Sequence, residues 1–548
     1  MNFKNIFKIL GKYFFFFSFI LLIPFFLSIY FKYFIGFQEH PQPHSVKAFF
    51  LSYICCLLFS AVLYFFGRES QGHLHRRESI LTVALIWILT PGISSLPFIF
   101  SDTLSNPIQA YFESVSGFTT TGASVLVGKE YNNHGQEKKI QLIIEGETPV
   151  VYEFFGTVPP VRNKEGQIIA EGIEAVSKAV LFWRSLTQWL GGVGIIVLFI
   201  AVLPSLGIGG KQLMSSEIPG PTEISLATRL RETASILWKV YLFFTVLQTV
   251  LLRLTNPDVT WFDAITISFS TLSTGGFSVK NASIGAFKNP ITEWVVILFM
   301  IVGSLNFAIW FNIIRKKIYK IFDVEIIIYF LVILLSCLFS TFSILNTDQQ
   351  LLTGEFVNIN SVKDAARFAT FQIVSANSST GFSTVNFDLW PYRVQVLMLV
   401  LMYVGGMSGS TCGGIKILRN YILFKITQFK VESIFRPETI KIMRIKHRKI
   451  SQEVSIKSLV FFVLIISISV MATLLFILDG LDPESALTFV GCSINNTGFS
   501  FRAYGPMQSC AFLSNFGMIL SCFLMIAGRL EFFALITILI PSFWKKTV

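Results

Sequence analysis

The sequence predicts an all-α polytopic membrane protein in which two N-terminal spans precede four tandem repeats of span, pore helix, filter and span. The first observation is composition: 53% of the 548 residues are hydrophobic and 14% are charged, whereas a soluble domain carries about 25% charged residues. The second is length, because apolar runs of about 18 to 25 residues, enough to cross a bilayer as helices, recur about ten times. The third is a Thr-Gly segment that returns four times between these runs.

The N-terminal region, residues 1–70, contains two apolar runs at 9–33 and 46–66. The first run follows Lys4 and Lys8 and could be taken for a secretory signal. It is longer than the usual apolar region of about 7–15 residues, however, and it lacks an A-x-A-like cleavage site. We therefore predict that this run is a retained helix.

The distribution of basic residues indicates membrane topology. The formal net charge is +12, and Lys and Arg concentrate at 73–79, 313–320 and 416–457, whereas the stretch at 128–178 has more acids than bases. Because basic connections stay in the cytoplasm, we expect these three stretches inside the cell and residues 128–178 outside. A nucleic-acid-binding protein would carry a soluble basic domain, which this sequence lacks, so nucleic acid is not an expected partner.

Internal repetition defines the organisation of the rest of the chain. The Thr-Gly segments are "SGFTTTGAS" (116–124), "FSTLSTGGFSV" (269–279), "SANSSTGFST" (375–384) and "CSINNTGFSF" (492–501). Each follows an apolar helix too short to span, at 105–115, 257–269, 362–374 and 481–490. The predicted pore repeats are 71–215, with an external insertion at 128–178, then 216–320, 321–450 and 451–548.

The four Thr-Gly segments are predicted to form an ion-selectivity filter. Non-helical backbone at membrane depth is tolerated only inside protein or beside a wet cavity, and four copies can surround one axis. Their carbonyl oxygens would replace the hydration shell of a monovalent cation, and glycine would supply the required dihedrals. A helix-packing surface of small residues is the alternative for a single copy. The predicted filter residues are Thr120, Thr121, Gly122, Ala123, Ser273, Thr274, Gly275, Gly276, Ser379, Thr380, Gly381, Phe382, Asn496, Thr497, Gly498 and Phe499.

The second span of the third repeat is predicted to break. It contains five glycines: Gly405, Gly406, Gly409, Gly413 and Gly414. Each costs a helix roughly 0.5–1 kcal/mol relative to alanine, and a close-packed helix interface would explain one glycine pair but hardly all five. A flexible intramembrane loop is the better interpretation, with the hydroxyls of Ser408, Ser410 and Thr411 satisfying part of the freed backbone.

Arg529 lies near the middle of the last apolar run, 511–540. A charge at that depth is costly, so its side chain should face the protein interior. It could line the ion pathway, or it could form a buried ion pair with an acid from another helix. Glu531, two residues on, should point elsewhere on the helix.

The sequence closely resembles the Trk/Ktr/HKT superfamily of potassium transport proteins, and within it the membrane subunits of bacterial Trk systems. The resemblance covers nearly everything from residue 70 on. It rests on the four Thr-Gly segments and on "FWRSLTQWLGGVGIIVL" (182–198), "RETASILWKVY" (231–241), "GGMSGSTCGGIKILR" (405–419) and "GRLEFF" (528–533). The insertion at 128–178 departs from the family pattern because it is longer than expected between the first filter segment and its following helix.

The resemblance implies potassium uptake across the bacterial inner membrane through a pseudo-fourfold pore. It implies a homodimer beneath which cytosolic nucleotide-binding subunits of the TrkA kind assemble, so that nucleotide is expected on that partner only and no cofactor on this chain. The glycine-rich loop would be the gate below the filter, including Thr411, and Arg529 would project into the pathway as an electrostatic barrier. The basic cytoplasmic segments could also contact anionic lipid.

Proteins with other functions would leave different patterns in the sequence. Sodium-permeable relatives carry Ser at the first filter glycine, whereas this chain has Gly122, which favours potassium. Coupling of transport to protons or sodium stays open. A proton-coupled carrier for organic solutes would show inverted repeats and ionisable groups near the midplane. No enzyme motif is present, so we do not expect an enzyme.

Overall fold

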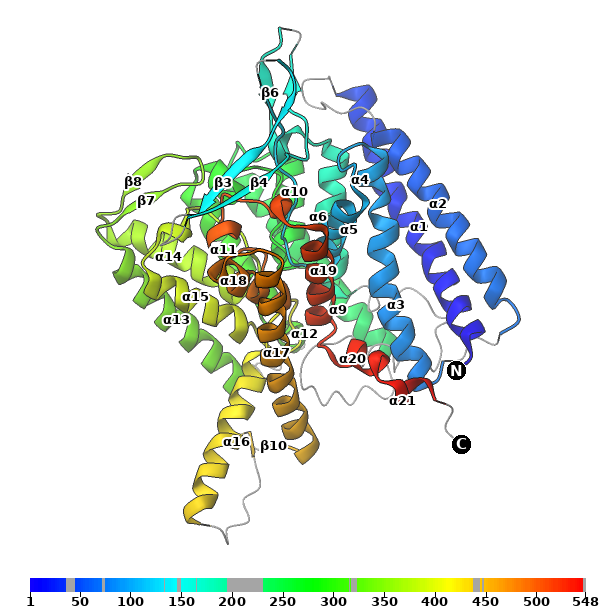
Figure 1. The fold of residues 1–548 in the computed structure, drawn as a ribbon. Helices are drawn as coiled ribbons and strands as arrows, with labels where there is room; N and C mark the ends of the chain where they lie inside the picture. Colours follow the sequence, from blue (N-terminus) through cyan, green and yellow to red (C-terminus); the bar gives the residue numbers. More distant parts are fainter. Residues whose placement is uncertain are drawn as a thin grey trace.

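In the described part of the chain, ten helices lie in the apolar runs that predicted about ten spans (Figure 1). Six helices of the described residues are long and apolar enough to cross a membrane, or seven if the bent pair α19 (Asn515–Arg529) and α20 (Phe533–Leu539) is one span. The structure, a computed structural model, describes residues 1–35, 45–70, 74–132, 134–144, 149–163, 165–194, 230–314, 316, 323–436, 444–445 and 448–545. The N-terminal pair is α1 (Phe3–Phe34) and α2 (Ser45–Gly67). The first spans of the repeats are α3 (Arg76–Ser94), α9 (Leu230–Thr255), α13 (Val324–Ile344) and α17 (Gln452–Leu478). The second spans are α6 (Lys178–Val193), α11 (Pro290–Ser304), α15 (Tyr392–Val404) and α19 (Asn515–Arg529).

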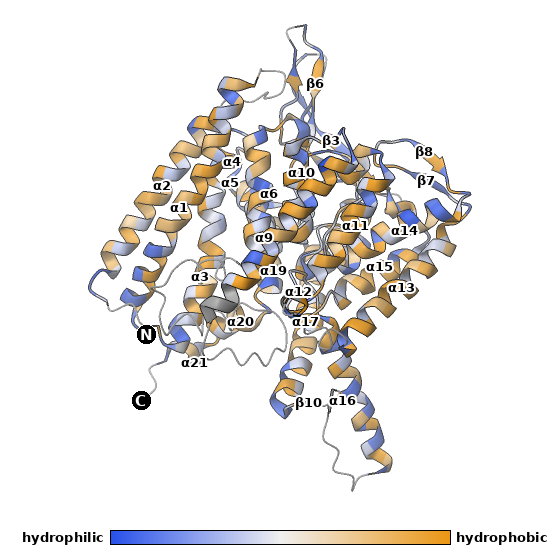
Figure 2. Ribbon diagram, turned by 180° about the vertical axis from the view of Figure 1, so that it is seen from behind, coloured by the Kyte–Doolittle hydropathy of each residue, from blue (hydrophilic) through white to orange (hydrophobic). Residues whose placement is uncertain are grey.

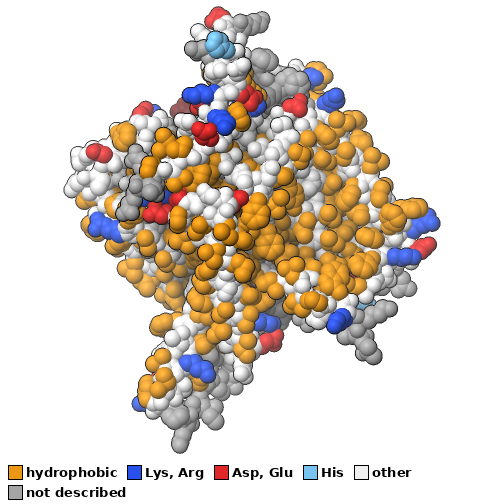
Figure 3. Space-filling model, viewed as in Figure 1, with side chains coloured by type: hydrophobic (Ala, Val, Ile, Leu, Met, Phe, Trp, Pro, Cys, Tyr) orange, Lys and Arg blue, Asp and Glu red, His pale blue; other side chains and the backbone are white. Residues whose placement is uncertain are grey.

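Hydrophobic residues run along the outer helices, as a membrane protein requires. Figure 2 shows them along most of α1, α2, α13 and α15, and Figure 3 shows hydrophobic side chains across the middle of one face, with charged ones toward its margins. Small residues let the N-terminal helices approach closely, because the Cα of Gly11 faces the backbone of Tyr64. The first apolar run forms α1, which packs on α2, α3 and α6.

All four second spans end or break at a similar depth, although the sequence predicted a break only in the third repeat. In the described chain α6 ends at Gly194 (φ +86°), and α15 is followed by Gly405 (φ +69°). Between α11 and α12 (Phe307–Ile314) Leu305 is extended. The prediction of one continuous run at 511–540 is wrong, because α19 and α20 (Phe533–Leu539) are bent by 118° at a break. The helices that follow are α16 (Ile417–Phe435) and α21 (Pro541–Trp544).

Each repeat places a short helix between its two spans, as predicted. These helices are α5 (Pro107–Phe118), α10 (Trp261–Leu272), α14 (Val362–Asn377) and α18 (Pro483–Asn495), and α4 (Leu96–Phe100) precedes the first of them. The short helices and the second spans contact one another in a closed ring, in the order α5, α6, α10, α11, α14, α15, α18, α19 and back to α5. Four similar repeats therefore surround one axis. The predicted boundary between repeats one and two falls outside the described residues.

The predicted external insertion folds into β-hairpins at one end of the molecule, and both chain termini lie at the other end (Figure 1). Its strands are β1 (Glu130–Tyr131), β2 (Glu137–Lys138), β3 (Ile140–Ile144), β4 (Val150–Phe154), β5 (Val161–Arg162) and β6 (Ile168–Ala170), followed by a short helical turn at Gly172–Ala175. Two further hairpins are formed by β7 (Asp348–Gln350) with β8 (Phe356–Asn358) and by β9 (Arg444–Ile445) with β10 (Arg448–Lys449). The described part of the basic stretch at 73–79 lies at the end that holds the termini, which is the predicted cytoplasmic side.

Candidate ion pathway

The four short helices begin with side-chain caps that fix where each one starts. Asn106 accepts a hydrogen bond from the amide of Ile108, and Asp482 accepts one from Ser485. Thr260 and Ser361 cap α10 and α14 in the same way. The C-terminal ends of these helices, each equivalent to about half a negative charge, precede the Thr-Gly segments.

The Thr-Gly segments share one backbone conformation that gives their register. In each segment two residues have a positive φ, with one other residue between them, and the second of the two is a glycine. The pairs are Thr120 (57°) with Gly122 (86°), Thr274 (55°) with Gly276 (75°), Ser379 (52°) with Gly381 (84°), and Asn496 (51°) with Gly498 (82°). These are dihedrals that glycine adopts at little cost.

This register corrects the predicted filter of the second repeat by one residue. The sequence aligned Gly275 with Gly122 because both follow a threonine, but the residue with the matching conformation is Gly276. The equivalent residues are therefore Thr274, Gly275, Gly276 and Phe277, and Ser273 is the C-cap of α10. The amides give the same register, since those of Thr121, Gly275, Thr380 and Thr497 each donate to a helix carbonyl five residues earlier, at 2.8–3.0 Å.

The four glycines and their neighbouring carbonyls close a ring. A Cβ atom at Gly122 would collide with the carbonyl oxygen of Gly275, and one at Gly276 with that of Thr380. Likewise a Cβ at Gly381 would collide with the Thr497 oxygen, and one at Gly498 with the Thr121 oxygen. Each glycine thus abuts the residue that precedes the equivalent glycine of the next segment. The contacts run from repeat one through two, three and four back to one, and they leave no room for a side chain.

A buried ion pair between Arg184 and Glu113 bonds to the backbone of the first two segments. Arg184 and Glu113 are almost fully buried, with Nε 2.7 Å from Oε1. Glu113 also accepts the amide of Val125 at 2.9 Å, and Arg184 donates to the carbonyl of Ser278 at 3.1 Å. Because each charge has an opposite charge and hydrogen bonds, the cost of its burial is offset.

Gln188 holds the second segment directly. Its Nε2 donates to the carbonyl of Gly275 at 2.6 Å, and its Oε1 accepts the amide of Phe277 at 3.0 Å. Arg184 and Gln188 belong to the α6 motif that resembles the family, but neither had a predicted role, and Glu113 was not among the predicted residues. Polar and charged residues inside otherwise apolar helices were the signal that could have found all three.

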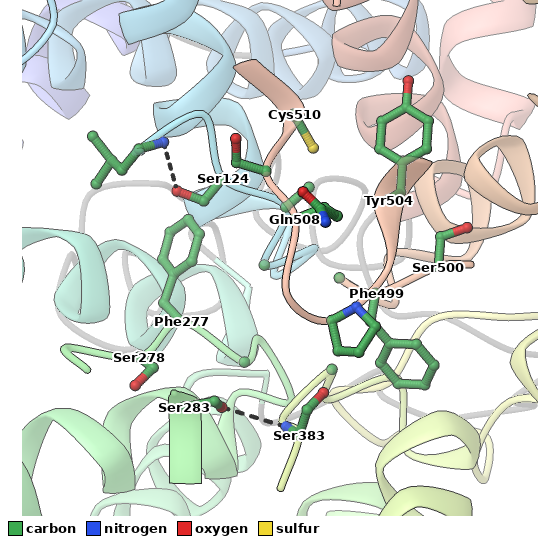
Figure 4. A pocket seen from close by; sticks show the side chains of 18 of the residues that line it. Ser124, Phe277, Ser278, Ser283, Ser383, Phe499, Ser500, Tyr504, Gln508 and Cys510 are labelled. Carbon is green, nitrogen blue, oxygen red and sulfur yellow. Dashed lines mark hydrogen bonds between the residues drawn. The ribbon is translucent and has the colours of Figure 1, made fainter. Parts of the chain in front are cut away.

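A vestibule opens beyond the glycine ring on the side of the insertion. The lining includes all four ring glycines, Gly122, Gly276, Gly381 and Gly498. Figure 4 shows serines from the four repeats around it, with Ser124, Ser278, Ser383 and Ser500 among the labelled residues. A hydrated cation could therefore reach the glycine ring through a polar entrance.

The glycine-rich loop contacts the Thr-Gly segments of the second and third repeats and the helices that lead to and from them. The Oγ1 of Thr411 is 3.1 Å from the carbonyl oxygen of Leu272 and 3.0 Å from that of Gly303, and it accepts from Thr274 at 3.3 Å. The amide of Gly413 donates to Ser379 Oγ at 2.8 Å. The loop thus contacts the Thr-Gly segments of repeats two and three at the residues with the first positive φ, Thr274 and Ser379. The predicted break at 405–416 is present, since α15 ends at Val404 and α16 starts at Ile417.

Arg529 joins the loop to the first Thr-Gly segment. It lies at the end of α19, beside the break, rather than in mid-helix as predicted. Its Nη1 donates to the carbonyl of Thr411 at 2.7 Å and to Thr120 Oγ1 at 3.3 Å. Its Nη2 donates to the carbonyls of Gly191 and Gly192 at 2.6 and 3.0 Å.

Glu531 lies just beyond the end of α19 rather than on the helix. It has a positive φ of 53° and pairs with both guanidinium nitrogens of Arg419. The break thus sends Glu531 toward α16 while Arg529 reaches the filter. The loop has an acid contact of its own, because the amide of Ser408 donates to Glu325 Oε1 at 2.6 Å.

Comparison with known proteins gives consistent matches. Residues 161–546 match the family model TrkH, described as a cation transport protein. The Trk system potassium uptake proteins TrkH of Escherichia coli K12 and Vibrio parahaemolyticus are 29% and 30% identical, and in both comparisons all of this chain and all of the relative are covered. The crystal structure of the potassium transporter TrkH from Vibrio parahaemolyticus covers both chains fully, with a TM-score of 0.77 and 27% identity.

These matches confirm a helical, multi-pass protein of the inner membrane and a transporter rather than an enzyme. The family model covers more than half of the sequence, and the full-length relatives extend the similarity to the N-terminal spans and the insertion. The chain therefore belongs to the TrkH family of cation transport proteins.

Proposed function

We propose that this chain carries potassium ions into the cell through a filter made by the four Thr-Gly segments. The observation that carries the proposal is the closed ring in which Gly122, Gly276, Gly381 and Gly498 each abut a carbonyl of the next segment. Four carbonyls at one level can replace the water around a monovalent cation. The names of the relatives, which are potassium uptake proteins, support the choice of potassium.

In the proposed filter a cation exchanges its water ligands for backbone oxygens step by step. A hydrated ion enters the serine-lined vestibule and loses water as backbone oxygens take its place. The C-terminal ends of the four short helices favour a positive charge at the inner end of the filter. Glu113, Arg184 and Gln188 hold the segments so that the oxygens stay at a fixed spacing.

We assign the role of gate to the glycine-rich loop, residues 405–414, together with Arg529. Contacts of the loop with Leu272, Gly303 and Ser379, next to the proposed filter, support this role, and Arg529 adds a positive charge beside the loop. Passage of an ion toward the cytoplasm requires these contacts to open. The five glycines make the loop able to move, because they restrict the backbone least.

Replacing Thr411 by Val tests the gate with a small change. The valine keeps the shape of threonine but removes the hydroxyl that lies against the carbonyls of Leu272 and Gly303. Since a hydrogen bond contributes about 1 kcal/mol, we expect potassium flux through the purified protein to rise roughly two- to fivefold. Thr427→Val, which removes a hydroxyl bonded only along α16 to Leu423 in the structure, is the control. If Thr411→Val and Thr427→Val had equal potassium flux, the Thr411 hydroxyl would have no role in gating.

We also propose a homodimer regulated by a separate cytosolic nucleotide-binding subunit of the TrkA kind. The basic segment beginning with α16 supports this, since α16 projects from the end that holds the termini (Figure 1). Such a contact depends on charge and weakens as salt is added. The partner should co-purify at low salt and dissociate at high salt. Nucleotide-dependent flux in protein purified without a partner would contradict this proposal.

Reconstitution into liposomes tests the potassium function itself. Potassium and sodium fluxes are measured separately, each under imposed proton and sodium gradients. We expect potassium flux well above sodium flux, and the response to the gradients distinguishes channel-like from coupled transport. Equal fluxes of both ions would favour a sodium-permeable transporter of the same fold instead.

A further inference from the structure

The insertion at 128–178 does more than extend the first repeat, because it also bonds to the second and fourth repeats. Its contacts lie on both sides of the vestibule, next to segments that continue directly from the filter. Ile173 of the insertion and Asn281 of the second repeat both line the vestibule itself.

One contact joins the insertion to the outer end of the second filter segment, five residues beyond Gly276. The Nδ2 of Asn281 donates to the carbonyl of Glu171 at 2.9 Å, and the amide of Ile173 donates to Asn281 Oδ1 at 2.8 Å. The amide of Asn281 in turn donates to Glu174 at 3.3 Å. The side chain and backbone of Asn281 are thus fixed by three residues within positions 171–174 of the insertion. We name this set the Asn281 latch.

A second contact joins β4 to the start of the fourth short helix. The hydroxyl of Tyr152 donates to Asp482 Oδ1 at 2.7 Å and accepts the amide of Asp482 at 2.9 Å. Asp482 is the N-cap of α18, whose other end leads into the fourth filter segment. The Tyr152 ring also packs against Phe512, with centroids 5.0 Å apart. We name this set the Tyr152 latch.

The chemistry of the Tyr152 latch suits a permanent contact. Burial raises the pKa of Tyr152 to about 12, so the hydroxyl keeps its proton and donates throughout the physiological pH range. From Phe512 the aromatic contacts continue to Tyr504 at 4.8 Å and on to Phe489, which stacks on Tyr504 at 3.8 Å. Tyr504 and Phe489 line the vestibule, so the packing from β4 reaches the entrance to the filter.

We infer that the insertion is an outer clamp that holds the filter segments of repeats one, two and four at their working separation. The first repeat carries the insertion, and the two latches fix it to its neighbours on either side of the ring. Gln188, Glu113 and Arg184 hold the first two segments at and just beyond the glycine ring. The clamp adds contacts farther out, at Asn281 and at the start of α18. Selectivity needs this constraint, because a loosened ring of carbonyls can close around the smaller sodium ion.

The test rests on the proposed potassium filter and uses variants that disturb the latches without altering filter residues. In Gly172→Ala the added methyl would lie 2.7 Å from Asn281 Oδ1, which pushes the latch apart. Gly166→Ala is the matched control, since Gly166 has a similar positive φ in the same insertion but no atom within 4 Å of the added methyl. Tyr152→Phe removes one oxygen and keeps the ring against Phe512. Potassium and sodium fluxes and the melting temperature are measured for each protein in liposomes.

We expect Gly172→Ala combined with Tyr152→Phe to lower the potassium-to-sodium flux ratio roughly fivefold, the ratio that corresponds to about 1 kcal/mol. Each single variant should lower it less, and Gly166→Ala should leave it at the parent value. If the double variant does not fold, the flux ratios of Gly172→Ala and Tyr152→Phe are each compared with those of the parent and Gly166→Ala instead. A parent-like flux ratio in variants whose melting temperatures fall would overturn the clamp and leave a purely structural role. A parent protein that does not prefer potassium would instead contradict the proposed function.

Discussion

Replacing Gly276 by Ser is expected to remove most of the preference for potassium over sodium, with a smaller effect for Gly275→Ser. Gly276 has φ +75°, and a Cβ there collides with the backbone oxygen of Thr380. A strained residue costs about 1–3 kcal/mol, so the selectivity ratio should fall roughly tenfold or more if the ring deforms to relieve that strain. At Gly275 the added atom meets the side chain of Gln188, which can move.

Gly354→Ser is the control for the filter variants. Gly354 has φ +88° in the loop between β7 and β8, and no atom lies within 4 Å of an added Cβ. Serine at position 354 therefore has a similar strain from its positive φ, but its Cβ atom does not collide with a carbonyl oxygen. Fluxes of both ions are measured per inserted molecule. If Gly275→Ser lowered selectivity and Gly276→Ser did not, the register taken from the backbone would be wrong.

Truncating Arg529 to Ala is expected to raise the maximal potassium flux severalfold. Two effects act in the same direction. A positive charge 4 Å from the ion path repels a cation by about 4 kcal/mol at an effective dielectric of 20, less once screened. The same side chain also ties the loop, through Thr411, to Thr120 of the filter and to Gly191.

Arg529→Lys separates these two effects. Lysine keeps the charge but presents one ammonium in place of a planar fork, so it cannot reproduce donation to carbonyls of both the loop and α6. Flux near the parent value would identify the charge as the barrier, whereas flux between parent and Ala would identify the bridge. The melting temperatures of both variants are measured with flux. A destabilised Ala variant with no gain in flux would make Arg529 a structural residue.

The repeat architecture followed from the sequence because it leaves a periodic pattern. Capping residues such as Asn106 and Asp482 mark where the short helices start, and they cap α5 and α18 in the structure. The glycine cluster at 405–414 predicted a break, since so many glycines are costly in one helix. Both the capping residues and the glycine cluster act on neighbouring residues in the chain, so the short helices and the break could be predicted from the sequence alone.

Other features depend on contacts between distant segments and could not be read locally. The sequence alone does not show whether Gly275 or Gly276 is equivalent to Gly122. In the structure Gly276 is the residue that packs against the carbonyl oxygen of Thr380, which belongs to another repeat and leaves no space for a Cβ atom. The bend after Arg529 has no proline or glycine at the bend itself, where Glu531 and Phe532 carry the positive φ. The pair of Glu531 with Arg419, more than a hundred residues away, accompanies that bend.

Thallium bound in place of potassium provides the most direct test of the filter. Thallium has a similar radius and scatters anomalously, so its position in crystals of the purified protein can be located without assumptions about the pathway. The account predicts a peak on the axis between the carbonyl oxygens of Thr121, Gly275, Thr380 and Thr497, lost in the Gly276→Ser variant. Thallium bound elsewhere in the membrane region, with no peak between these four oxygens, would contradict a filter formed by the four segments.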